Sequence, residues 1–372
     1  MAHIRSVPVA LAASVGIGLG AIGLAPASGA SSDGPVTVAS GLNNPRQLAV
    51  GPGQRLYVAE AGTNDSCSPI SGVDEAIQFC GLVGSVTQVR GATQERVVTG
   101  LPTLTFNGEL MGASDVDVRG NSIAVLVGGM AIGASSRDGL GGDFERFGTL
   151  QTGRLSQAAI TGADLDVAAD LNAYEVASNP DGNTPPDSNA VGFAALDSKN
   201  WVVTDAGGNY LREVGKRGES TIAVFPDGAA VPNPFGPGEI LPQAVPTDVA
   251  VGPDGAYYVS QLTGFPFPTD GSTIWRVTRD GQVSEYATGL TTVTSLAWQG
   301  DTLYAVQYDD VNFLDGQFIG SLRQVTPGGS EHEAVASHLS APYGVAIRGK
   351  SAYVTTGATS SGGGAVVRVD LR

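Results

Sequence analysis

The sequence predicts an all-β fold, a six-bladed β-propeller of four-stranded antiparallel blades. Three observations lead to this prediction. A strand–turn–strand phrase recurs through the chain, further apolar strands follow its copies, and an unpaired strand stands at the beginning of the repeat region. Repeats of this kind bury their faces only against one another. The clearest copies span residues 45–60, 246–261, 293–307 and 342–356, and weaker copies begin near residues 113 and 190.

Each copy has the same internal order. A short apolar run precedes a Gly-rich turn, such as residues 51–54 or 252–255, and a β-branched and aromatic run follows. Turn residues of this type supply the backbone angles of a hairpin, and the following run favours a strand. A third strand and, after another tight turn, a fourth are predicted, which together make a propeller blade. We expect third strands at 84–89, 272–277, 320–325 and 364–369, and fourth strands at 95–98, 221–225, 283–287 and 333–336.

The two ends of the repeat region predict how the ring closes. The last copy ends soon after its third strand, whereas residues 35–40 resemble the fourth strands found elsewhere. We therefore expect residues 35–40 to complete the last blade, which removes exposed sheet edges. Residues 31–372 then form one propeller domain, with blade onsets near residues 45, 113, 190, 246, 293 and 342.

The first 30 residues have the pattern of a secretory signal peptide. A weakly basic start is followed by an apolar run, and small residues precede possible cleavage points after Ala27 or Ala30. An uncleaved anchor is the alternative. The only two cysteines, Cys67 and Cys80, bracket a polar insertion. In an exported protein this arrangement predicts a disulfide, and two free thiols are the alternative.

The charge balance narrows the range of partners. The chain carries 36 Asp and Glu against 20 Lys and Arg, a formal net charge of −16. Such a protein repels nucleic acids and anionic membrane surfaces. We expect a secreted monomer that binds a small molecule or an extracellular protein, without nucleic acid and without membrane insertion after signal cleavage.

Long insertions occupy residues 61–83, 128–146, 172–189 and 227–245. In blade topology these connections lie on one face of the ring, and loops on a rigid scaffold commonly carry function. Neutral drift of the loops is the alternative. The insertion-bearing face is therefore the predicted ligand-binding face, at the mouth of the central channel. Its candidate ligand-binding residues are Asn209, Gln261, Phe265, Phe267 and Gln307.

Acidic residues recur at two equivalent positions of the repeat. Glu60 and Asp205 end second strands, and Asp115 and Asp248 stand third in innermost strands. Carboxylates gathered at a channel mouth suit a hard cation, so Ca²⁺ is the candidate cofactor and these four are its candidate ligands. The alternative is that they bind loop backbone or line the channel. The catalytic residues remain unknown.

Two common kinds of chemistry have no support in the sequence. After the predicted signal peptide only His332 and His338 remain, both near an outer strand. A histidine base or a histidine zinc site at the channel mouth is therefore not expected. No Gly-rich phosphate loop opens a helix, so nucleotide binding is not expected either.

Longer phrases of the chain resemble a known family. Residues 249–259 are similar to the NHL-type repeat, and residues 35–371 together resemble the ScyD/ScyE family. The segments that carry this resemblance are 41–46, 57–62, 67–87, 179–182, 205–209 and 262–268. It implies an exported propeller with no established reaction. Related repeats often have Glu where this chain has Gln261 and Gln307, which weakens an acidic site.

The sequence thus predicts a binding or interaction module rather than an enzyme. One alternative is a metal-assisted hydrolase or lactonase of the six-bladed type. The other, implied only by the family resemblance, is an accessory protein in the maturation of a secreted pigment or natural product.

Overall fold

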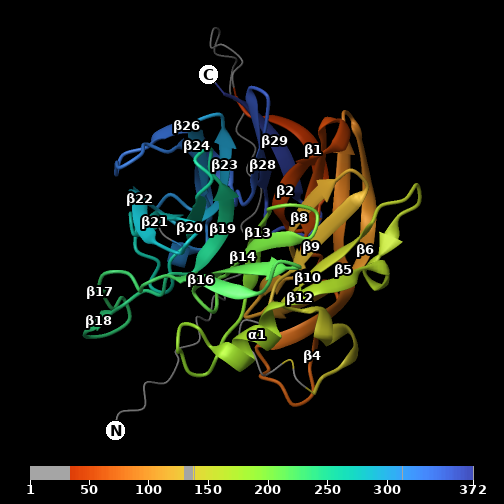
Figure 1. Cartoon of the computed structure of the whole chain (residues 1–372), viewed down its shortest axis with the longest axis horizontal. Helices are drawn as coiled ribbons and strands as arrows, with labels where there is room; N and C mark the ends of the chain where they lie inside the picture. The colour runs from red at the N-terminus through yellow and green to blue at the C-terminus, as the bar shows by residue number, and fades with distance from the viewer. Residues whose placement is uncertain (1–33, 130–136, 138, 312, 372) are drawn as a thin grey trace, which may run out of the picture.

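The structure is a computed structural model that describes residues 34–129, 137, 139–311 and 313–371. The predicted signal peptide, residues 1–30, lies outside the described residues. The chain forms antiparallel sheets arranged around a centre, and Figure 1 shows β2, β8, β13, β19 and β23 near the middle of the view. These innermost strands and β27 contact one another in turn, and β27 contacts β2. The molecule is therefore an all-β propeller.

Five sheets are blades of four strands. Listed from the innermost to the outermost strand, the first two blades are β8 (Ala113–Arg119), β9 (Ser122–Val127), β10 (Thr149–Arg154) and β12 (Asp166–Asp170), and then β13 (Ala190–Ala195), β14 (Asn200–Asp205), β15 (Tyr210–Gly215) and β16 (Ser220–Val224). The next two are β19 (Pro246–Val251), β20 (Tyr257–Gln261), β21 (Ser272–Val277) and β22 (Val283–Leu290), and then β23 (Val293–Gln299), β24 (Thr302–Gln307), β25 (Ile319–Gln324) and β26 (Glu333–Ser340). The last blade consists of β27 (Val345–Arg348), β28 (Ser351–Thr356), β29 (Gly364–Asp370) and the N-terminal strand β1 (Val36–Leu42).

The prediction of six four-stranded blades is wrong, because the structure has five blades of that kind. The residues expected to form another belong to a seven-stranded sheet. Its two long strands of 14 residues each extend past the expected strand ends and recruit short partners, one of them parallel. The sequence suggested loops where these strands continue. The seven strands are β2 (Pro45–Gly51), β3 (Arg55–Glu60), β4 (Ser68–Pro69), β5 (Ile77–Arg90), β6 (Thr93–Phe106), β7 (Glu109–Met111) and β11 (Ile160–Thr161).

The N-terminal strand closes the ring. β1 pairs antiparallel with β29, with Val36 opposite Arg368 and Leu42 opposite Gly364. The expected pairing of residues 35–40 with the last blade is confirmed. Because β1 leads directly to β2, this pairing ties the sheet of β27 to the seven-stranded sheet.

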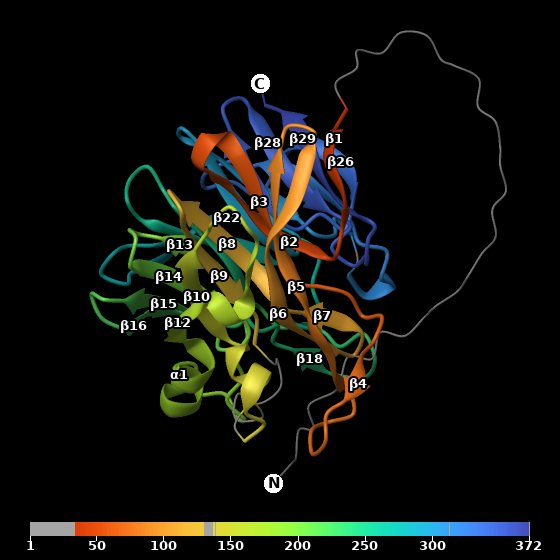
Figure 2. The same ribbon diagram turned by 90° about the vertical axis from the view of Figure 1, so that its right-hand side faces the viewer.

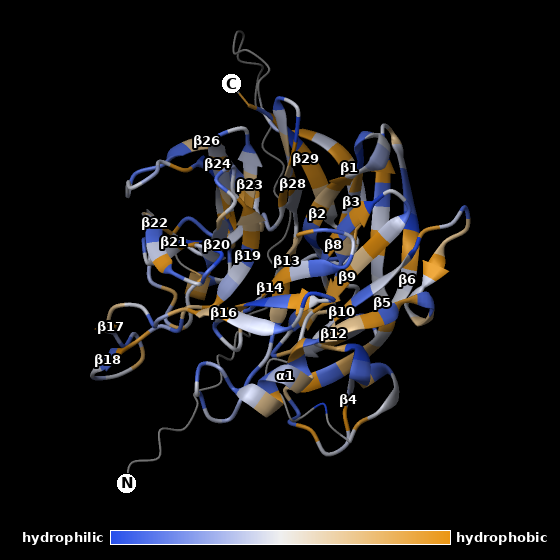
Figure 3. Cartoon of the chain, in the orientation of Figure 1, coloured by the Kyte–Doolittle hydropathy of each residue, from blue (hydrophilic) through white to orange (hydrophobic). Residues whose placement is uncertain are grey.

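The core lies between neighbouring sheets. Val86 of β5 and Val125 of β9 belong to one buried cluster, whereas Leu48 of β2 and Val366 of β29 belong to another. Each such cluster joins two sheets, and removing this apolar area from water provides the main driving force for assembly. Figure 3 shows hydrophobic residues along the strands and many hydrophilic residues in the connections.

One side of the molecule carries most of the additional structure. The short helix α1 (Leu171–Ser178) and the hairpin of β17 (Val231–Pro232) and β18 (Glu239–Ile240) are inserted between blades. Figure 2 shows α1, β4 and β18 on the same side, which we call the loop-rich face. Cys67 and Cys80 form a disulfide beside β4. None of the helices in the described part of the chain is long and apolar enough to cross a membrane.

Candidate functional site

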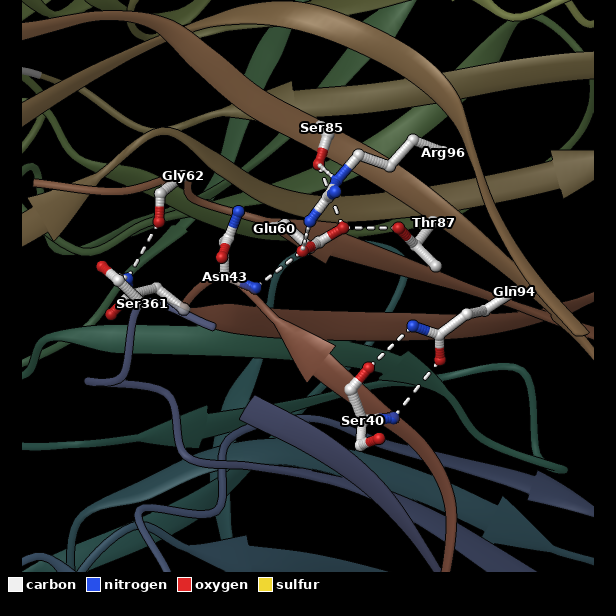
Figure 4. A network of polar contacts seen from close by, with 10 residues as sticks. Ser40, Asn43, Glu60, Gly62, Ser85, Thr87, Gln94, Arg96 and Ser361 are labelled. Atoms are coloured by element: carbon white, nitrogen blue, oxygen red, sulfur yellow. Dashed lines mark hydrogen bonds and ion pairs between the residues drawn. The ribbon is translucent and has the colours of Figure 1, made fainter. Parts of the chain in front are cut away.

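Glu60 ends β3 and is buried among hydrogen-bond donors. Its Oε2 accepts from the backbone N–H of Asn43 at 2.6 Å and from Arg96 at 3.0 Å. Its Oε1 accepts from Ser85 Oγ at 3.0 Å and from the Thr87 hydroxyl. Figure 4 shows these donors around the carboxylate. Glu60 therefore holds the segment that leads into β2, and its oxygens are already used.

Asp205 plays the same part at the end of β14. One oxygen accepts from Ser188 Oγ at 2.7 Å and from the Tyr210 hydroxyl at 3.2 Å. The other accepts three backbone N–H groups, including that of Asn189 at 2.7 Å, just before β13. Burial raises the pKa of Asp205, and these hydrogen bonds oppose the rise.

The three candidate amide side chains are also held inside the protein. Gln307 ends β24 and accepts the backbone N–H of Thr291, just before β23, at 3.0 Å. Gln261 accepts the N–H of Thr273 at 3.1 Å, and Asn209 accepts that of Val245 at 3.0 Å. All three are buried. Gln307 and Asn209 therefore hold the segments just before β23 and β19, and Gln261 holds a residue of β21.

Asp115 and Asp248 join neighbouring sheets. Asp115 in β8 accepts the backbone N–H of Phe193 in β13 at 2.8 Å. Asp248 in β19 accepts the N–H of Leu296 in β23 at 2.8 Å and the Ser295 hydroxyl at 3.0 Å. Each also accepts the N–H of its own next residue. In β8 and β19 the third position thus carries an acceptor for the next sheet.

The residue before this acceptor contributes a complementary contact. The Thr247 hydroxyl donates to the Val293 carbonyl at 2.6 Å, and the Thr294 hydroxyl donates to the Tyr343 carbonyl at 2.6 Å. Both bonds run from one innermost strand to the chain of the next sheet. The pairs Thr247–Asp248 and Thr294–Ser295 therefore form hydrogen bonds that link one sheet of the ring to the next.

The innermost strands surround a cavity of about 300 Å³, lined by Gln47, Asp115, Asp117, Phe193, Asp248 and Ser295 among others. Burial raises the pKa of Asp248 to about 6. Burial, followed by the charge of Asp248, raises the pKa of Asp115. Two ionised carboxylates facing one cavity repel each other, so the pair favours retaining a proton.

Of the four candidate metal ligands, only Asp115 and Asp248 line this cavity. Glu60 and Asp205 lie at strand ends, each surrounded by its own donors. Across the described residues, no three His, Cys, Asp or Glu side chains are grouped so that they would hold one metal ion. The geometry therefore offers these four acids structural partners instead of a shared ion.

A continuous row of aromatic rings crosses the loop-rich face. Its outer end is Phe235, whose side chain is 73% exposed and stacks on Phe265 with ring centroids 5.7 Å apart. Phe265 contacts Phe267, which lies 4.3 Å from Phe313 between centroids. The rings of Tyr308, Phe318 and Tyr343 continue the row inward. We call these seven residues the aromatic track.

The inner end of the aromatic track reaches the innermost strands. Tyr343 precedes β27, and the guanidinium of Arg46 in β2 lies 4.8 Å from its ring centroid. Phe267 and Phe318 both have positive φ angles, 56° and 49°. Bulky residues rarely adopt this backbone conformation, and such strain is concentrated at functional sites.

Comparisons with known proteins show the fold. No protein-family model matches the chain, and no curated protein matches it. A glucose dehydrogenase structure is 14% identical with a TM-score of 0.50, covering 91% of this chain and 99% of its own. A candidate gluconolactonase is 9% identical with a TM-score of 0.50, covering 92% and 95%. Virginiamycin B lyase from Staphylococcus aureus is 10% identical with a TM-score of 0.45, covering 90% and 98%.

The two structures with a TM-score of 0.50 support a β-propeller fold and leave the ScyD/ScyE resemblance a prediction. The Pro- and Phe-containing segments at 234–237 and 264–268 point from the sequence to Phe235, Phe265 and Phe267, but sequence reasoning missed the other four members of the track. The aromatic residues are dispersed from Phe235 to Tyr343 along the chain. Only the closed ring brings their loops together, so the spacing of these residues in the sequence does not predict that their rings are in contact.

Proposed function

We propose that this chain is a secreted ligand-binding propeller whose loop-rich face binds a small molecule with a planar apolar surface. The aromatic track carries this proposal. Exposed rings provide large and rigid contact area, and they bind planar ligands by stacking. Phe235 supports this proposal because its ring is exposed at the end of the row. Aromatic residues that only pack the protein interior would be buried along the whole row.

The charge of the protein restricts the ligand. With a formal net charge of −16, the molecule disfavours anions, and the faces of aromatic rings attract cations. The ligand class is therefore a neutral or cationic molecule with an aromatic or similarly flat apolar part. The polar candidates are occupied by protein donors, so the proposal assigns ligand contact to the aromatic track instead of to these side chains.

The alternative of a metal-assisted hydrolase gains no support from the geometry of the four acids. Such an enzyme needs ligands that meet at one ion beside an open position for substrate. Here Glu60 and Asp205 bind separate loops, and Asp115 and Asp248 bind neighbouring strands. No described contact favours a role in pigment or natural-product maturation.

Three probes with one ring system test the proposal. Saturation-transfer NMR would compare 2-naphthol, 2-naphthylmethylammonium and 2-naphthoate with the full mature chain. We expect the neutral and cationic probes to bind and the anionic probe to bind least. Phe265→Ala should abolish most of the signal because Phe265 links the exposed ring to the rest of the track.

Val167→Ala removes an exposed apolar side chain of β12 that is no part of the track, and it serves as the matched control. The control should retain the signal of the unchanged protein. The proposal is wrong if none of the probes binds, if the anionic probe binds as well as the others, or if Phe265→Ala binds them unchanged.

A further inference from the structure

Helix α1 packs a group of polar side chains against the loops of its own blade. Asn172, Glu175 and Asn179 are spaced three and four residues apart, so they share one face of the helical segment. Asn172 and Glu175 are fully buried. Gly208, between β14 and β15, lies against the carboxylate of Glu175, whereas Gly148, before β10, lies against Asn172.

Glu175 is the unusual member of this group. Its side chain has 0% exposure, and neither carboxylate oxygen has a hydrogen-bond partner within the described structure. An ionised carboxylate is very costly to bury without compensation. The pKa of Glu175 is raised to about 8, first by burial and then by the charges of Asp205, Asp181 and Asp187. All the charged groups acting on it are therefore carboxylates.

Two further buried oxygens lack partners, one in Asp187, whose charge acts on Glu175, and one in Asn179, the C-cap of the same helix. They are Oδ1 of Asp187 and Oδ1 of Asn179. By contrast, the carboxylates of Asp205 and Asp181 have hydrogen-bond donors, and Asp181 accepts hydrogen bonds from the side chains of Asn183 and Asn209. When Glu175 is ionised the unsatisfied atoms are all acceptors, so they cannot satisfy one another.

Two glycines allow the loop to pass between these acids. A Cβ atom on Gly208 would lie 2.9 Å from Glu175 Oε2, and one on Gly207 would lie 3.0 Å from the carbonyl oxygen of Asp187. Glu175 and Asp187 therefore flank the same two residues. Glycine is required at both positions, because a Cβ atom at either would clash with these neighbours.

We propose that Glu175, Asp187 and Asn179 bind one Ca²⁺ ion on the loop-rich face, at a site distinct from the four acids identified in the sequence. This inference goes beyond the binding function proposed above and does not depend on it. The three side chains offer four unpartnered oxygens. Ca²⁺ takes six to eight oxygen ligands in flexible geometry, so backbone carbonyls and water complete its shell.

The ligand chemistry selects the ion. The site contains neither sulfur nor imidazole, which zinc prefers, and Mg²⁺ requires a stricter octahedron. The site consists of two carboxylates and one amide with unsatisfied oxygens. It is therefore consistent with the finding that no three His, Cys, Asp or Glu side chains of the described residues are grouped around one point. The bound ion would tie α1 to the loops before β13 and after β14.

Calorimetric titration with CaCl₂ tests this site on the full mature chain after treatment with a chelator. We expect one Ca²⁺ per chain and a higher melting temperature with Ca²⁺. Glu175→Gln should weaken Ca²⁺ binding about 100-fold. Without Ca²⁺ and at a pH above about 8, where Glu175 is ionised, the same variant should melt above the unchanged protein, because the unsatisfied charge has been removed.

Glu285→Gln, an exposed acid of β22, is the matched control and should bind Ca²⁺ normally. Asp187→Asn provides a second variant should Glu175→Gln not fold. Its readout is Tb³⁺ luminescence excited through Tyr210, which hydrogen-bonds Asp205 beside the site. Emission should appear in the unchanged protein, fall when Ca²⁺ is added, and be lost in Asp187→Asn.

The proposal is wrong if the unchanged protein shows neither binding heat nor a higher melting temperature with millimolar CaCl₂. It is also wrong if the variants at residues 175 and 187 bind Ca²⁺ as the control does. A response to CaCl₂ that MgCl₂ reproduces in full would contradict the choice of ion.

Discussion

Asp115 of β8 accepts the backbone N–H of Phe193 of β13 at 2.8 Å, so a carboxylate of one sheet fixes the first strand of the next. Asp248 repeats the contact with Leu296 of β23. Both carboxylates are buried and face the central cavity. In this fold an acidic residue at the centre of the ring is therefore part of the joint between sheets.

Removing such a joint should destabilise the ring. Asp248→Ala leaves the Leu296 N–H and the Ser295 hydroxyl without their acceptor, and we expect a loss of about 2–4 kcal/mol in the free energy of unfolding. Urea unfolding followed by circular dichroism measures this loss. Asp301→Ala, at an exposed turn after β23, should change stability by less than about 0.5 kcal/mol. Equal effects of the two substitutions would contradict a joint at Asp248.

The raised pKa of Asp248 predicts a pH dependence with a definite sign. Its pKa rises from 3.8 to about 6 on folding, chiefly through burial. A raised carboxyl pKa contributes stability at low pH that is lost as the pH rises through the folded value. The stability of the unchanged protein minus that of Asp248→Asn should therefore fall between pH 4 and about 6.5. A difference that rises over this range would refute the assignment.

Glu60 should hold its loop in a way that hydrogen exchange detects. Glu60→Ala removes the acceptor of the Asn43 N–H and the partner of Arg96, and we expect a loss of roughly 3 kcal/mol. Glu60→Gln retains one acceptor oxygen and should cost about 1 kcal/mol. The backbone amide of Asn43 should lose protection in both variants. Unchanged protection at Asn43 would show that the loop is held by other contacts.

The disulfide should stabilise the extended part of the seven-stranded sheet. Cys67 and Cys80 are 13 residues apart, and closing a loop of this length contributes roughly 3 kcal/mol in the chain-entropy model. The double variant Cys67→Ser with Cys80→Ser should unfold at correspondingly lower urea concentration. An unchanged urea midpoint would mean that the insertion is held by its strand pairing alone.

The ring closure could be predicted from the sequence because β1 resembles the other outermost strands and the repeat that contains β29 has no outermost strand of its own. The extent of β5 and β6 was not readable. The insertion at residues 61–83 looked polar, yet Phe79 within it pairs opposite Leu104 of β6. Cross-strand pairing between distant residues decided the length of these strands, and local composition did not reveal it.

The positions of the candidate polar residues could be predicted from the sequence, but their role as hydrogen-bond acceptors for backbone could not. The recurrence of polar residues at the ends of second strands is visible in the sequence, but their N–H donors lie in loops placed only by the fold. Glycine replaces the acceptor at Gly192 because a Cβ there would lie 2.5 Å from the Thr247 carbonyl oxygen. Helix α1, with its Asp170 N-cap and Asn179 C-cap, had a local signal that an all-β prediction overlooks.

Fluorine NMR of the protein labelled with 4-fluorophenylalanine tests the aromatic track most directly. The chain has 11 phenylalanines, and single Phe→Leu variants assign their resonances. With saturating 2-naphthol we predict shifts at Phe235, Phe265 and Phe267, and none at Phe79 and Phe144, which pack together elsewhere. Unmoved track resonances, or shifts only at Phe79 and Phe144, would contradict ligand binding by the aromatic track.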